Sequence, residues 1–169
     1  LTARRTALEA RLEEEERRGI ARAARKVGGR RVDEDLQVES GLRPAVEAAL
    51  ADATRAYVVR GATVSEMAAE RGALIVEERA VESGSAAVAG AGSDARGRRF
   101  RDALQDAGGG LLAEAIRRDG AGVARRLLTR AAWAPDLAAC LALQSSLPPG
   151  WIVVPRDGSA VLTDVAVTL

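Results

Sequence analysis

The first 27 residues constrain this chain more than any other segment, because they read as one long, charged helix. Residues 1–27 contain no proline, and acidic residues precede basic ones at the i,i+4 spacing that stabilises a helix, as in Glu13–Arg17. The apolar positions form only a thin seam, made of Leu1, Leu8, Leu12, Ile20 and Val27. A lone helix of this kind is marginal in water, so we expect it to pack against a partner helix from outside the sequence. The alternative is an ordinary N-terminal helix with a solvated face.

The other end of the chain predicts strands. Residues 151–154 are a short apolar run, and Asp157-Gly158 is a dipeptide that tight hairpin turns prefer. Valines at positions 161, 165 and 167 then suggest one or two further strand segments. Valine-rich strands at the end of a chain leave an edge that has to be covered.

The residues between these ends predict a mixed α/β fold with two similar halves. Each half runs from an amphipathic helix into a short apolar strand, and a Gly/Ser/Ala-rich stretch separates them. We expect a helix stub at 1–27 and a globular domain at 28–169, with lobe I at about 28–82, a linker at about 83–97 and lobe II at about 98–169. The expected strands are 56–59, 73–78 and 131–134, and the expected helices start at Pro44 and at 63, 98, 111, 122 and 135.

Several kinds of chemistry are excluded by the residues that the chain lacks. It has no histidine and one cysteine, Cys140, so Ser-His-Asp triads, His- or Cys-based metal sites and internal disulfides are ruled out. It also has no phosphate loop of the G-x-x-x-x-G-K-[ST] type and no apolar run long enough to span a bilayer. The acidic run Asp33–Asp35 suits a cation such as magnesium, but a solvated turn is the favoured interpretation. We therefore expect a non-catalytic domain without a cofactor, since a carboxylate-dependent enzyme needs converging acids that no spacing suggests.

Three stretches carry a more specific pattern: VESGLRPAVEAALADATRAYVV at 38–59, RRLLTRAAWAPDLAACLAL at 125–143 and VVPRDGSAVLTDVAVT at 153–168. In this order and at this spacing they resemble the hinge domain of structural-maintenance-of-chromosomes (SMC) ATPases. The resemblance implies a two-lobed α/β hinge with a stub of coiled coil. Residues 1–27 would be the end of the incoming arm, paired with an antiparallel partner helix, and we expect the chain, which does not start with Met, to be a piece of a longer protein.

The resemblance also implies a function. A hinge of this family would form a homodimer that joins two coiled-coil arms for chromosome segregation and condensation, and the parent protein would be a cytoplasmic, nucleoid-associated ATPase whose heads lie elsewhere. The residues expected at the dimer edge or on its supporting face are Ile152, Val154, Val161, Val165 and Val167. For Ile152 and Val154, an interior position in the sheet is equally expected.

Weak, sequence-independent DNA contact near the arm junction is the other implied property. The net charge is only +1, with 25 basic and 24 acidic residues, so extensive wrapping of nucleic acid is not expected. Clustered cations nonetheless suit phosphates, and the candidates are Lys26, Arg30, Arg31, Arg98, Arg99 and Arg101. Phe100 lies among these arginines and would stack on an unpaired base or anchor a core, of which the core is favoured.

The chain departs from the family pattern at glycines. Ala51 and Asp52 replace a Gly-Gly pair after the first helix of the domain, and Val165 and Leu169 stand where the family tends to have glycine. Glycine allows close backbone approach, so these side chains are expected to affect the interface geometry. The alternative function is a small α/β ligand-binding or regulatory domain with a helical dimerisation stalk, whose pocket would be lined by the Gly-rich stretch.

Overall fold

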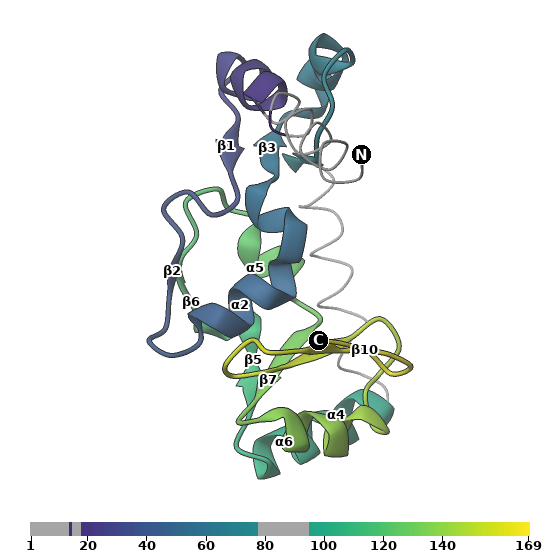
Figure 1. The fold of residues 1–169 in the computed structure, drawn as a ribbon. Coiled ribbons are helices and arrows are strands. Elements are labelled where there is room, and N and C mark those ends of the chain that lie inside the picture. Colours follow the sequence, from purple (N-terminus) through teal and green to yellow (C-terminus); the bar gives the residue numbers. More distant parts are fainter. Residues whose placement is uncertain (1–13, 15–17, 78–94) are drawn as a thin grey trace, which may run out of the picture.

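The computed structural model describes residue 14, residues 18–77 and residues 95–169, and it places them in an elongated mixed α/β arrangement (Figure 1). Residues 18–77 are called the first lobe below, and residues 95–169 the second lobe. Each lobe has a small sheet of its own, and a two-stranded sheet links the lobes. The predicted mixed α/β class is confirmed. Most of the Gly-rich stretch at 82–97 lies outside the described residues.

The first lobe is built on a three-stranded sheet of order β1-β3-β4. β1 (Arg30–Arg31) runs antiparallel to β3 (Tyr57–Val59), and β3 runs parallel to β4 (Leu74–Val76). The 3₁₀ helix η2 (Gly61–Met67) connects β3 to β4. Helical residues 18–26 precede β1, and the chain turns at Gly28 with a φ of +81°. The predicted end of the N-terminal helix at the glycine pair is therefore confirmed.

The last turns of that helix are covered by the chain itself. Ile20 and Ala24 are buried against Tyr57, Val59 and Met67 in a small core of the first lobe. The sheet of the first lobe therefore covers Ile20, one of the five seam positions, and a partner helix for residues 1–27 stays a prediction. The earlier seam positions at 1, 8 and 12 lie outside the described residues.

The second lobe is built on a five-stranded sheet of order β10-β9-β8-β7-β5. β7 (Ala131–Ala134) and β8 (Ile152–Pro155) are its parallel central pair. The outer strands β5 (Gly110–Leu111), β9 (Val161–Leu162) and β10 (Val167–Thr168) are antiparallel to their neighbours. The helices α4 (Ala95–Asp106) and α6 (Leu137–Gln144) pack at the lower end of the molecule in Figure 1.

Local residues explain how these second-lobe elements begin and turn. The Asp136 carboxylate accepts a hydrogen bond of 2.8 Å from the Ala139 backbone N–H, which caps α6. The predicted Asp-Gly turn lies between β8 and β9, where Gly158 has a φ of +71° and its N–H donates to the Pro155 carbonyl at 2.8 Å. α4 begins at Ala95, earlier than the expected start of lobe II near residue 98.

One hydrophobic core joins the two lobes. β2 (Gln37–Val38) pairs antiparallel with β6 (Ile116–Arg118), which brings residues from both lobes side by side. The helices α2 (Arg43–Leu50) and α5 (Ala124–Leu127) lie beside this pair, with the 3₁₀ helices η1 (Ala51–Arg55) and η3 (Leu112–Ala115). The buried residues of this shared core are Val32, Ala45, Val46, Leu50, Ala56, Val58, Leu112, Ile116, Val123, Ala124, Leu128, Ala131 and Val154.

Two segments that were predicted as α-helices have other secondary structure. Residues 111–118 form the end of β5, then η3 and β6, because β5 pairs with β7, Leu112 of η3 packs in the shared core, and β6 pairs with β2. Residues 63–71 were expected to form a helix with a capping box at Thr63. The structure has η2 instead, and the Thr63 hydroxyl donates to the Arg60 carbonyl at 2.8 Å, which ties up the side chain in a local turn.

Ala51 has a backbone conformation that favours glycine, with φ of +46° and ψ of −128°. A side chain in this region costs about 1–3 kcal/mol of strain. We therefore expect Ala51→Gly to raise the free energy of unfolding by about 1 kcal/mol, because relief of strain exceeds the entropy that glycine adds to the unfolded chain. Urea denaturation measures the change. The control is Ala48→Gly inside α2, which should lower stability by about 0.5–1 kcal/mol; a loss at both positions would contradict the prediction.

Candidate dimer edge and basic surfaces

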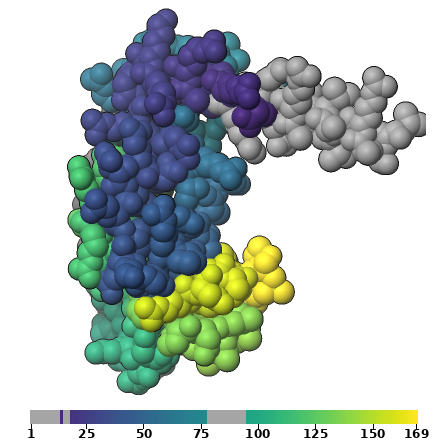
Figure 2. All heavy atoms as spheres, turned by 60° about the vertical axis from the view of Figure 1, so that its left-hand side comes forward, coloured from purple at the N-terminus to yellow at the C-terminus, as the bar shows by residue number. Residues whose placement is uncertain are grey.

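The five-stranded sheet ends at β10, whose outer edge pairs with no strand in the described part of the chain. β10 pairs with β9, where Val167 lies opposite Leu162. Large apolar side chains are exposed along this end: Val167 is 42% exposed, Val165 87% and Leu169 91%. Figure 2 shows the C-terminal residues, in yellow, projecting from the body of the molecule. An unpaired edge with apolar side chains is a template for pairing with another chain.

Side-chain hydrogen bonds fix the position of this edge. Between β9 and β10, the backbone N–H of Thr163 donates to the Ala166 carbonyl at 2.9 Å, and the Ala166 N–H donates to the Thr163 hydroxyl oxygen at 3.0 Å. From α6, the side-chain amide of Gln144 donates to the Thr163 carbonyl at 2.8 Å. The β9–β10 hairpin is therefore attached to α6 of its own lobe, so β10 is already ordered in the single chain.

The five residues predicted for the dimer edge fall into two groups. Val165 and Val167 lie together on the exposed hairpin. Ile152 and Val161 are half-buried and pack against the shared core. Val154 is 0% exposed, because β8 lies between β7 and β9 in the middle of the sheet. Its side chain supports the sheet from within and offers no surface to a partner.

β4 ends the sheet of the first lobe, and sequence reasoning missed its position. Residues Leu74–Val76 were predicted as a strand, and all three are half-buried. β4 pairs with β3, and its outer side faces no strand among the described residues. Strand order depends on contacts between distant segments, so no local sequence signal marks β4 as an edge.

The basic residues predicted for DNA lie on two separate surfaces. Lys26 and Arg30 are exposed near β1, and the Arg30 guanidinium donates to the Gly120 carbonyl at 3.4 Å. Arg31 is half-buried and forms an ion pair of 2.6 Å with Asp33. Arginines 98, 99 and 101 are exposed on α4, at the opposite end of the molecule from β1 (Figure 1). The structure therefore does not bring the two sets together.

The residues singled out for other chemistry have structural roles. The Asp33 carboxylate is held by Arg31, and no group of three or more acidic or cysteine side chains gathers around a possible metal position in the described ranges. Burial raises the pKa of the Cys140 thiol from 9.0 to about 11, so it is protonated at neutral pH and is a poor nucleophile. Phe100 is 0% exposed and packs edge-to-face on Trp151, which confirms the prediction of a core anchor.

No helix in the part of the chain that the structure describes is long and apolar enough to cross a membrane. Among the described residues, two sheets end in a strand whose outer side pairs with no strand, and the two lobes share one core.

Comparison with known proteins identifies this architecture. No protein-family model and no curated protein matches the sequence. Among solved structures, the chain is similar to the crystal structure of an asymmetric dimer of the Geobacillus stearothermophilus SMC hinge domain, with 19% sequence identity and a TM-score of 0.62. The similarity covers 96% of this chain and 68% of the other. Because it extends over both lobes, the chain has the fold of an SMC hinge domain, at a sequence identity that marks it as divergent.

Proposed function

We propose that the chain is a dimerisation hinge, in which the β10 edge of one copy pairs with a second copy. The observation that carries the proposal is the exposed apolar edge formed by Val165, Val167 and Leu169, because such an edge is unfavourable in a monomer. The fixed hairpin supports it, since an ordered edge loses less entropy on binding. The similar solved structure is that of a hinge dimer, which agrees with the proposal.

Val167→Lys tests this hinge directly. Val167 is only 42% exposed, and pairing along β10 would remove it from water, so an ammonium at this position should weaken self-association at least tenfold. Molar mass by light scattering over a dilution series gives the dissociation constant. We expect a dimer for the unmodified chain and a monomer for the variant over the same concentration range.

Leu127→Lys is the matched control for this measurement. Leu127 is a large apolar residue with a similar exposed fraction, 39%, but it lies on α5, which is not part of the five-stranded sheet. Its replacement should leave the molar mass unchanged. A monomer for the unmodified chain at all concentrations, or equal weakening by both variants, would overturn the proposed interface.

The proposed function also includes a coiled-coil arm and a contact with DNA. We infer that residues 1–27 belong to a coiled-coil arm with an antiparallel partner helix, and that the hinge joins two arms of a chromosome-segregation ATPase in the nucleoid. Lys26 and Arg30 are exposed where the helix meets β1, and in this proposal they neutralise phosphates at that junction. With a net charge of +1, the contact is expected to be weak and to fall with added salt.

A further inference from the structure

A cavity of about 410 Å³ opens in the first lobe beside the shared core. Its walls come from α2, from η1 and from the segment between β1 and β2. This volume lies in the range of small-molecule sites, about 300–1,000 Å³. The lining residues are Arg31, Asp33, Leu36, Val38, Arg43, Val46, Glu47, Thr54 and Arg55. Neither the proposed dimer edge nor the arm helix contributes to it.

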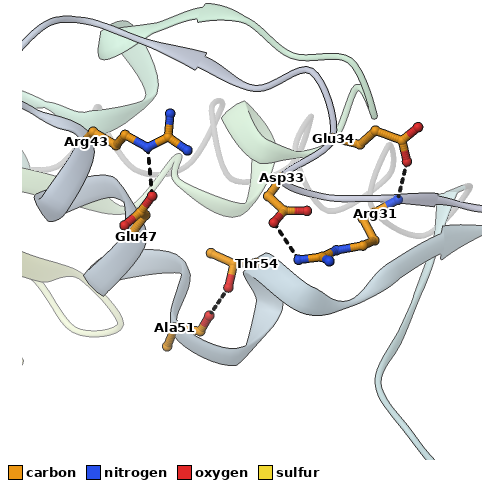
Figure 3. Close-up of polar contacts among 7 residues, drawn as sticks. All are labelled: Arg31, Asp33, Glu34, Arg43, Glu47, Ala51 and Thr54. Atoms are coloured by element: carbon orange, nitrogen blue, oxygen red, sulfur yellow. Dashed lines mark hydrogen bonds and ion pairs between the residues drawn. The ribbon is translucent and has the colours of Figure 1, made fainter. Parts of the chain in front are cut away.

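The polar groups of this cavity are mostly hydrogen-bond donors. Figure 3 shows the guanidinium groups of Arg31 and Arg43 directed into the same space from opposite walls. Arg43 uses its Nε to donate to Glu47 at 2.8 Å, which leaves its terminal nitrogens available. The Arg55 side chain makes no hydrogen bond or ion pair with any described residue. A guanidinium has five N–H donors and no acceptor, so each of these groups has capacity left for an anion.

Arg31 also has a buried nitrogen without a hydrogen-bond partner among the described residues. One terminal nitrogen donates to Asp33 at 2.6 Å, but its Nε is buried and has no hydrogen-bond partner among the described residues. A buried donor without a partner costs about 1–3 kcal/mol, and native structures rarely keep one unless an ion or water completes the site. A small rotation of this guanidinium toward an anion would supply the missing acceptor.

Charge and shape together define the ligand. Three arginines face two carboxylates in the cavity, so one positive charge is left over after the Arg31–Asp33 and Arg43–Glu47 pairs are counted. The remaining wall is apolar, and its accessible part is formed by the half-buried Leu36 and Val38. We propose that this cavity binds a small phosphomonoester with an apolar body, whose phosphate lies between Arg31, Arg43 and Arg55 and whose apolar part packs on Leu36 and Val38.

Phosphate fits this arrangement because guanidinium groups bind it through paired N–H donors. Arg31 was also a candidate for DNA contact, and a backbone phosphate has the same chemistry. The aliphatic wall favours a small ligand, because a phosphodiester in a duplex has no apolar group to fill it. A duplex that occupies the cavity is therefore a distinct outcome, which the experiment has to separate.

Phenyl phosphate is the probe, titrated into the isotope-labelled full chain and followed by amide chemical shifts in NMR spectra. We expect saturable shifts at the amides of Thr54, Arg55 and neighbouring cavity residues, and weaker binding of inorganic phosphate. Arg55→Gln should weaken phenyl phosphate binding about tenfold or more, because a charge-assisted contact is lost. Arg43→Gln should act in the same direction, and since its ion pair with Glu47 is largely exposed, the fold should tolerate the change.

Arg118→Gln is the matched control, because Arg118 is an exposed arginine on β6 that does not line the cavity. Its replacement should leave binding unchanged at equal ionic strength. The proposal is overturned if phenyl phosphate causes no saturable shifts, if the Arg118 variant weakens binding as much as the Arg55 variant, or if a short DNA duplex shifts the cavity amides while phenyl phosphate does not. These results do not depend on the dimer, whose test is the molar mass of the chain.

Discussion

Phe100→Ala is expected to lower the free energy of unfolding by about 3–5 kcal/mol, the range for removing a buried aromatic side chain. Phe100 is 0% exposed, and its ring lies 5.5 Å from the ring of Trp151 at an interplanar angle of 65°. This edge-to-face pair anchors α4 to the core of the second lobe. Among the described residues of this core, Trp151 is the one other aromatic residue, and it already occupies its own position beside the cavity that alanine would leave.

Urea denaturation followed by tryptophan fluorescence measures this loss, since Trp151 reports on the affected core. The control is Phe100→Leu, which keeps most of the buried volume and should cost only about 1–1.5 kcal/mol. If Phe100→Ala costs less than Phe100→Leu, or less than 1 kcal/mol, Phe100 does not anchor α4. The alternative role of stacking on an unpaired base is inconsistent with a ring that has no exposed surface.

Phe100 also illustrates what sequence patterns could predict. The sequence favoured a core position for Phe100 because a lone phenylalanine at the start of a helix is usually a core anchor, and the arginines around it form a solvated face. The strands at 57–59, 74–76 and 131–134 were predicted because each is a compact apolar run beside turn residues. The resemblance of three separated stretches to SMC hinges predicted the fold, which the similarity to a solved hinge domain confirms.

The features that the sequence predicted wrongly or missed share a physical cause. Residues 111–119 have good helix formers, but three different contacts divide them: β5 pairs with β7, η3 enters the shared core, and β6 pairs with β2. Tertiary contacts override local propensity in such a segment. Sheet order had the same limitation: the sequence predicted an edge among the C-terminal valine-rich strands, but it left open whether Val154 lies at that edge or, as the structure has it, in the middle of the sheet. The cavity was missed because its arginines come from 31, 43 and 55, with no motif to connect them.

The shared core leads to the second large effect. Leu112 is 0% exposed in η3, and it packs in the core that also contains Val46 and Val58 of the first lobe. Leu112→Ala should cost about 2–5 kcal/mol. Because the Leu112 side chain packs against residues of both lobes, its loss weakens both, and the variant should still unfold in one transition. Urea denaturation curves followed by circular dichroism and by tryptophan fluorescence should coincide.

Amide hydrogen exchange distinguishes a shared core from two independent lobes. Leu112→Ala should reduce protection in β3 of the first lobe as well as in β8 of the second, since both strands pack on the same core. Met67→Ala is the matched control, because Met67 is 2% exposed in the separate small core of helical residues 18–26 and β3. Its effect should be concentrated in the first lobe. If Leu112→Ala left β3 protected, the lobes would be energetically independent and could hinge about the β2–β6 pair. Reduced protection in both strands would mean that the two lobes open as one cooperative unit.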